Sequence, residues 1–175
     1  LVTSSPSGDS WPVLLALEAK VVLASAAGER TLMLDEFFVS YRQTALQPGE
    51  ILKSILVPRI PAEARSVRKF YKVSKRREMD ISTVAGAFAV SLGESGTIVR
   101  ARLAYGGVAA MPVRARKAEA TLIGKAWKPE TAEVVVGLLA SEFTPNPDVR
   151  GTASYRLRLI TSLLRNFFPE GTVRA

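Results

Sequence analysis

The spacing of the apolar residues changes at Pro112, and this change constrains the fold more than any other feature of the sequence. Before it, residues 97–105 alternate between apolar and charged or small side chains, with the period of two that is typical of a β-strand. After it, residues 153–168 repeat apolar side chains every three or four positions, which indicates an amphipathic helix. A group of strands followed by a group of helices predicts the α+β class.

The second part of the chain, residues 62–175, is predicted to be a three-stranded antiparallel sheet packed with about three helices. The expected strands are residues 70–74, 84–92 and 97–105. On the third strand one face would hold Val99, Ala101, Leu103 and Tyr105. The expected helices are residues 113–122, 129–143 and 153–168. Thr152 would cap the last helix, and Arg156 falls outside its apolar stripe.

The first part, residues 1–61, is predicted to be a lobe of mixed strands and short helices. Asp9 or Ser10 would cap a short helix, and Asp35 would cap a single helical turn. Gly28 would lie in the turn between two antiparallel strands. The expected strands are residues 20–24, 31–34 and 51–57. Two prolines follow the last strand, so we place the boundary between two domains, 1–61 and 62–175, within residues 58–66.

The sequence contains no cysteine and no histidine, which removes several chemistries from this chain. Zinc, iron–sulfur and haem sites depend on those ligands, and triad-type nucleophilic catalysis depends on an imidazole base. We therefore predict no metal site and no catalytic residue, and favour a bound cofactor that supplies the chemistry. No apolar run approaches the roughly 18 residues that a membrane span needs. We expect a soluble, cytoplasmic protein that binds no membrane.

Positive charge is concentrated in the second part of a chain whose net charge is +8. Residues 65–77 carry seven Lys or Arg and no acid. Such a run attracts nucleic acid, an anionic nucleotide cofactor or an acidic partner, and charge alone does not choose among them. Nucleic-acid binding also needs aromatic side chains for base stacking, and only Phe70 and Tyr71 interleave with the cations. We therefore predict no nucleic-acid partner.

Five short motifs carry a resemblance to a known family. They are TSSPSGD at 3–9, PGEIL at 48–52, YKVSKRRE at 71–78, AYGGVAAM at 104–111 and DVRGTASYR at 148–156. Together they resemble the FAD-binding subunit of xanthine dehydrogenases, in the molybdenum hydroxylase family. The resemblance spans nearly the whole chain. It implies an incomplete FAD-binding lobe at 1–61, followed at 62–175 by the C-terminal domain of the CO dehydrogenase flavoprotein type.

The resemblance also implies which residues bind the cofactor. Thr3, Asp9, Leu52 and Lys72 match positions that contact FAD in the family. The Lys72 ammonium would hold negative charge on the reduced ring or on a phosphate. Gly106 and Gly107 match a turn that serves close backbone packing, and Arg150 and Arg156 a segment that serves capping or contacts between domains or subunits.

The function implied by the resemblance is electron transfer from iron–sulfur clusters through FAD to NAD, within a xanthine dehydrogenase of purine catabolism. Molybdopterin and 2Fe-2S clusters would belong to partner subunits or missing segments, so that the protein would be a hetero-oligomer and the isolated chain inactive. Two alternatives stay open. The chain could be the flavoprotein part of a related CO, nicotinate or aldehyde dehydrogenase, or a non-catalytic assembly and docking module.

Overall fold

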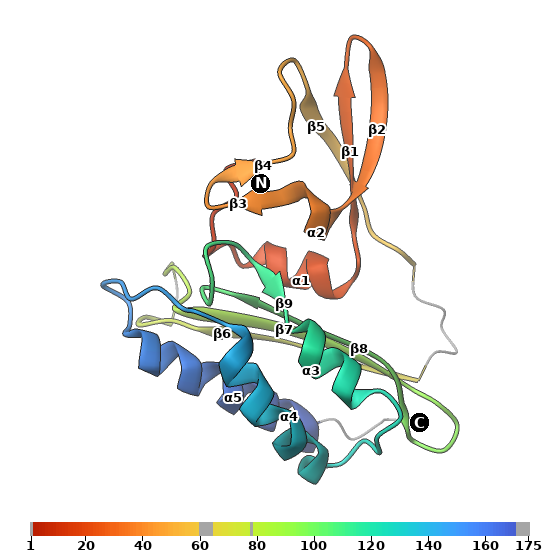
Figure 1. The fold of residues 1–175 in the computed structure, drawn as a ribbon, viewed down its shortest axis with the longest axis vertical. Coiled ribbons are helices and arrows are strands. Elements are labelled where there is room, and N and C mark those ends of the chain that lie inside the picture. Colours follow the sequence, from red (N-terminus) through yellow and green to blue (C-terminus); the bar gives the residue numbers. More distant parts are fainter. Residues whose placement is uncertain (1, 60–64, 78, 171–175) are drawn as a thin grey trace.

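A four-stranded antiparallel sheet covered by helices on both faces forms the larger part of the molecule (Figure 1). The computed structural model describes residues 2–59, 65–77 and 79–170. Helices α3, α4 and α5 lie below this sheet, helix α1 lies above it, and a smaller three-stranded sheet rises from the α1 side (Figure 1). The α+β class predicted from the sequence is confirmed.

The larger sheet has the order β6-β7-β8-β9. Its strands are β6 (Ser66–Val73), β7 (Val84–Leu92), β8 (Ile98–Gly106) and β9 (Val113–Arg114). The helices that follow are α3 (Arg116–Leu122), α4 (Pro129–Glu142) and α5 (Ala153–Glu170). The hydroxyl of Thr152 accepts a hydrogen bond from Tyr155 N at 3.2 Å, as a capping residue does.

The fourth strand, β9, is a difference from the prediction, which placed residues 113–114 in a helix and gave the sheet three strands. Val113 and Arg114 pair instead with Tyr105 and Ala104 on β8. The first four N–H groups of a helix have no partner inside it, whereas the open edge of β8 supplies partners for these residues. The helix therefore begins only at Arg116.

The face of the larger sheet toward α3–α5 holds the main core. Phe88 contacts both Tyr105 and Phe167, with ring centroids 5.1 Å and 5.3 Å apart. Val99, which the alternation placed on this face, is 57% exposed. A bulge explains the difference: Ser91 pairs with Arg100 and the next residue pairs with Ile98, so Val99 is the extra residue and Ile98 is buried in its place.

The opposite face of the sheet packs against the first lobe. Ala87 and Ala104 belong to the same apolar cluster as Trp11 and Leu15 of helix α1 (Ser10–Ala16). Small side chains on β7 and β8 allow the helix to lie close to the sheet. The predicted domain boundary falls partly on residues 60–64, which lie outside the described ranges, and the packing of α1 joins the two parts of the chain.

The first lobe contains two small sheets. Strands β1 (Lys20–Ser25), β2 (Gly28–Met33) and β5 (Ile51–Leu56) pair in the order β2-β1-β5. Strands β3 (Phe38–Ser40) and β4 (Gln43–Thr44) form a short ribbon after helix α2 (Leu34–Phe37). No helix among residues 2–59, 65–77 and 79–170 is both long enough and apolar enough to span a bilayer.

Two local predictions in this lobe were wrong. Gly28 is the first residue of β2 and not part of the turn. Its φ of +131° is a conformation that glycine adopts readily and other residues rarely adopt. Asp35 lies inside α2, which begins at Leu34. The Glu36 carboxylate accepts a hydrogen bond from Met33 N at 3.1 Å and thereby takes the capping role.

Candidate functional site

The structure brings Asp9 and Lys72 together although they lie 63 positions apart. The Asp9 carboxylate accepts a hydrogen bond from Lys72 Nζ at 2.7 Å and another from the hydroxyl of Ser82. The sequence predicted that Asp9 would cap α1 or bind FAD. It occupies the position before α1 but makes no side-chain capping bond, because its carboxylate turns toward β6 and the segment before β7.

Lys72 reaches this position because of the alternation of β6. Tyr71 points toward the main core, where it contacts Phe88 with ring centroids 5.7 Å apart. Lys72 therefore projects from the other face of the strand, toward the segment before α1. Its Nζ also donates to the backbone oxygen of Asp80 at 2.8 Å, so the lysine joins three separate segments of the chain.

Both members of this pair keep capacity for a polar ligand. Within the described part of the chain Lys72 donates to two acceptors, and an ammonium has three N–H groups. Each Asp9 oxygen accepts one hydrogen bond and can accept a second. About a third of each side chain is exposed, 33% for Lys72 and 37% for Asp9. A ligand at this surface could contact both charges.

Thr3 and Leu52, the other predicted FAD contacts, are not brought to this pair. Thr3 lies exposed before α1 and, among the described residues, makes no hydrogen bond to Asp9 or Lys72. Leu52 lies on β5, opposite Leu23 of β1, and packs against the core of the first lobe. Their contact with FAD stays a prediction, since no contact in the structure tests it.

A basic groove extends from Lys72 along the loop after β6. We use this name for the open hollow of about 420 Å³ lined by residues 72–77, four of which are cationic. Asp80 organises the loop by accepting a hydrogen bond from Arg76 N at 2.9 Å. That bond holds the pKa of Asp80 below its usual range, against the opposing effect of burial.

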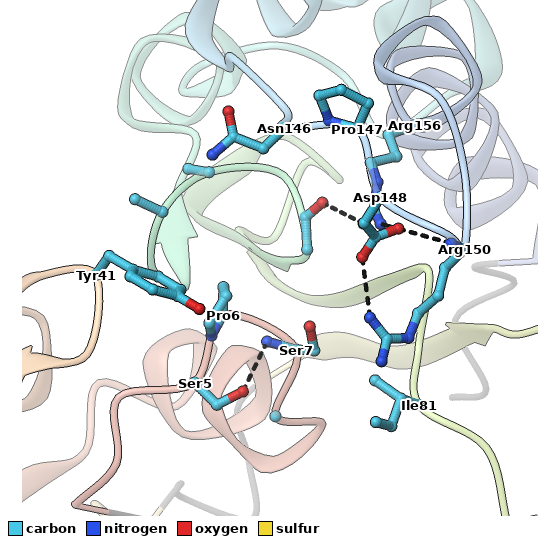
Figure 2. A pocket seen from close by; sticks show the side chains of 14 residues that line it. Ser5, Pro6, Ser7, Tyr41, Ile81, Asn146, Pro147, Asp148, Arg150 and Arg156 are labelled. Carbon is cyan, nitrogen blue, oxygen red and sulfur yellow. Dashed lines mark hydrogen bonds and ion pairs between the residues drawn. The ribbon is translucent and has the colours of Figure 1, made fainter.

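A cavity of about 440 Å³ lies beside the pair and is the main hollow of the site (Figure 2). Its wall combines the segment before α1, the turn after β8, the loop before α5 with Arg156 of α5, and two separate side chains, Tyr41 and Ile81. Figure 2 shows Tyr41 beside Pro6 and the Arg150 side chain extending toward Ile81. Gly8 and Ile81, which line this main cavity, directly precede Asp9 and Ser82 in the sequence.

An Arg–Asp–Arg cluster forms one side of the main cavity (Figure 2). Asp148 accepts hydrogen bonds from Arg156 at 2.5 Å and from the Arg150 guanidinium at 2.9 Å. Burial opposes ionisation of Asp148. The hydrogen bonds from Arg150 N and from the two guanidinium groups outweigh it, so the pKa of Asp148 is lower than usual. The cluster contributes one net positive charge to the cavity wall.

Arg156 is buried, with 3% of its surface exposed, although the apolar stripe of α5 leaves it outside. Its guanidinium donates to the backbone oxygens of Thr83 and of Gly107, the latter at 2.8 Å. Its buried Nε has no acceptor among the described residues. Arg156 therefore joins α5 to the residue before β7 and to the turn after β8. A further contact of Arg150 or Arg156 with another subunit stays a prediction.

Glycine gives that turn its shape, as the sequence predicted. A Cβ on Gly107 would lie 2.4 Å from the oxygen of Thr83, and one on Gly106 would lie 3.2 Å from both Pro6 and Pro12. The chain therefore approaches itself closely on both sides of the pair Gly106–Gly107. The cavity itself could not be predicted from the sequence, because its lining comes from five segments that are distant along the chain.

Two family models match the chain. The model described as CO dehydrogenase flavoprotein C-terminal domain matches residues 69–170. The model described as FAD binding domain in molybdopterin dehydrogenase matches residues 1–60. Asp9 lies in the second match and Lys72 in the first, so the ion pair between them joins the two matched segments.

Known proteins resemble the chain over nearly all of its length. It is 36% identical to a xanthine dehydrogenase of Emericella nidulans over 97% of the chain and 12% of that protein. It is 29% identical to the nicotinate dehydrogenase FAD-subunit of Eubacterium barkeri over 97% of the chain and 58% of that subunit. A structure of CO dehydrogenase from Oligotropha carboxidovorans superposes with a TM-score of 0.89 at 26% identity, over 99% of the chain and 59% of the matched one. The chain thus spans less than two thirds of each relative.

Proposed function

The chain belongs to the CO dehydrogenase flavoprotein family, and from this premise we propose that it is the FAD-binding part of a molybdenum hydroxylase. The observation that carries the proposal is the ion pair between Asp9 and Lys72. It places an anion and a cation, each with unused hydrogen-bonding capacity, where the FAD-binding match meets the C-terminal domain. A cofactor held there would contact both parts of the chain.

The residues of the site fit FAD. When bound, FAD supplies the electron-transfer chemistry that the side chains of this protein lack. Lys72 would place a positive charge beside a ring that gains negative charge, and the basic groove would extend that field toward the phosphates. Ser82 holds the Asp9 carboxylate, and Asp9 and Asp80 O hold the ammonium, so the pair is oriented before any ligand arrives.

The main cavity supports NAD as the electron acceptor in our proposal. Its volume of about 440 Å³ lies within the range of small-molecule pockets, and Tyr41 offers an aromatic side chain on which a base or a nicotinamide ring can stack. The Arg150 guanidinium at its edge is a donor for phosphate or ribose oxygens. The cavity adjoins the proposed flavin site through Ile81 and Gly8, as a hydride acceptor requires.

The proposed partners follow from the chemistry that this chain lacks. Without cysteine or histidine it cannot hold iron–sulfur clusters, so we assign the 2Fe-2S clusters and molybdopterin to other subunits or segments of a hetero-oligomer. The named relatives include a xanthine dehydrogenase, a nicotinate dehydrogenase subunit and a CO dehydrogenase. We propose xanthine as the substrate of the complex. The second candidate is a related flavoprotein role in CO, nicotinate or aldehyde oxidation. We propose the cytoplasm as the location of the complex.

Equilibrium titration with FAD tests the proposal against the alternative of an assembly module. The fluorescence of added FAD would be followed with the chain alone and with the chain mixed with its partner subunits. We expect saturable binding of one FAD per chain, at least in the presence of the partners. If the chain assembles with its partner subunits and the complex still shows no FAD bound to this chain, the chain is a docking module and the FAD assignment is wrong.

A further inference from the structure

A second cavity, which the flavin proposal does not use, lies on the α1 side of the larger sheet. Its volume is about 120 Å³, enough for several water molecules, of which each needs roughly 10–15 Å³. Four arginines line it: Arg59, Arg68, Arg100 and Arg102. Within the described residues no Asp or Glu lines it, and its remaining walls are small apolar residues, leucine, proline and two serines.

The register of the sheet creates this arginine cavity. Arg68 on β6 pairs with Ala89 on β7, which pairs in turn with Arg102 on β8. One row further along, Ser91 of β7 lies between Ser66 and Arg100. In both rows a small residue on the central strand lies between longer or polar side chains from the outer strands. The central strand therefore forms a floor, and guanidinium groups rise on both sides of it.

The positive charge around the arginine cavity is only partly neutralised. Arg100 and Arg102 share a single carboxylate, Glu18, with Arg114. Arg114 takes the second nearby acid, Glu119, at 2.6 Å. Burial, together with repulsion from neighbouring guanidinium groups, lowers the pKa of Arg100 and of Arg102. Within 4.0 Å of these three arginines, the described residues thus offer two carboxylates in all.

We propose that the arginine cavity is a binding site for a phosphate group. Guanidinium groups form paired, charge-assisted hydrogen bonds to tetrahedral oxyanions, and Ser66 and Ser91 add hydroxyl donors on the floor. The cavity, at about 120 Å³, has room for the phosphate itself. A bound dianion would supply the negative charge that the two carboxylates leave missing around the arginines.

This site is distinct from the flavin site. Ser66 and Lys72 lie at opposite ends of β6, and six residues of extended strand span about 20 Å. The arginine cavity also shares no lining residue with the basic groove or with the main cavity, so we assign its phosphate to a second ligand and not to a dinucleotide held by Lys72. Free phosphate and the phosphate of a nucleotide are both compatible with the chemistry, and the experiment separates them.

Calorimetric titration of the intact protein with inorganic phosphate, with AMP and with chloride tests the proposal. We expect saturable binding of phosphate or AMP and none of chloride; tighter binding of AMP would identify a nucleotide, and equal binding the free oxyanion. Arg100→Gln should weaken binding about tenfold, because it removes a charge-assisted contact. Glu18→Gln should strengthen it several-fold, because it releases guanidinium groups from their internal partner.

A matched control is Arg158→Gln, which removes the same charge from an exposed position on α5. It should leave phosphate binding unchanged, which shows that the effect of Arg100 is local and not one of net charge. Two results would overturn the proposal: no saturable binding of phosphate or AMP by the unmodified protein, or equal affinities in Arg100→Gln and Arg158→Gln when thermal unfolding shows both to be folded.

Discussion

At the scale of single residues, the site depends on side chains whose role is fixed by partners distant in the sequence. The motif at 3–9 marked Asp9 as polar and close to a helix start, and both properties are correct. Its actual partners, Lys72 and Ser82, could not be predicted from spacing, since they lie 63 and 73 positions away. Arg156 is the opposite case. The helical period places it outside the apolar stripe of α5, yet it is buried and donates hydrogen bonds to three acceptors.

Gly107 gives a prediction about backbone packing at the site. Its φ of +77° is costly for other residues, and a Cβ would also meet the oxygen of Thr83 at 2.4 Å. We expect Gly107→Ala to lower the free energy of unfolding by about 2–4 kcal/mol, from backbone strain plus the displaced contact. Urea denaturation measures the change.

The control for this variant is Gly96→Ala. Gly96 has a similar φ of +74°, but a Cβ there meets no atom within 4 Å. It should cost only the backbone term, about 1 kcal/mol. Equal losses in the two variants would show that the close approach to Thr83 has no energetic effect.

At the scale of elements, helices and central strands follow from local patterns, and edges do not. Residues 84–92 form a strand with the predicted bounds, since turns flank a continuous apolar run. β9 was missed because two residues carry no period, and only the open edge of β8 makes them a strand. The bulge that exposes Val99 is likewise set by pairing with β7 and not by the residues of β8 alone.

The start of α3 gives a prediction at this scale. Its N-terminal N–H groups are capped from another helix, because the Glu142 carboxylate accepts hydrogen bonds from Lys117 N at 3.0 Å and Ala118 N at 2.8 Å. A glutamine has only one acceptor oxygen, so Glu142→Gln should lower the free energy of unfolding by about 1 kcal/mol. Glu94→Gln, in an exposed turn, should change it by less than about 0.5 kcal/mol. Equal effects in chemical denaturation would refute the capping role.

At the scale of the whole molecule, one short helix joins the two matched segments. Helix α1 contributes Trp11 and Leu15 to a cluster that also contains Ala87 and Ala104 of the larger sheet. The sequence predicted both the helix and the sheet but not their contact, because alanines on a strand do not reveal what covers them. The proposed flavin site and the main cavity lie at this junction, so their geometry depends on the tertiary packing.

The stability of the whole molecule should depend on pH through its paired carboxylates. The Arg30 guanidinium and Gln47 N lower the pKa of Glu50 from 4.5 to about 2. A pKa lower in the folded state means that the stabilisation is fully present above about pH 4.5 and is lost as the pH falls toward 2. Thermal unfolding across this range should show a smaller decline for Glu50→Gln than for the unmodified protein, while Glu94→Gln should keep the full decline. Parallel curves for all three proteins would contradict this origin of the pH dependence.

The affinity of the Lys72→Gln variant for FAD tests whether Asp9 and Lys72 form part of the FAD site. We expect a dissociation constant about tenfold higher for Lys72→Gln in the assembled protein, because one charge-assisted contact is lost. Lys117→Gln, which removes the same charge from an exposed position on α3, should bind FAD as the unmodified protein does. Equal FAD affinities for Lys72→Gln and Lys117→Gln, with both proteins folded, would show that Lys72 does not bind FAD.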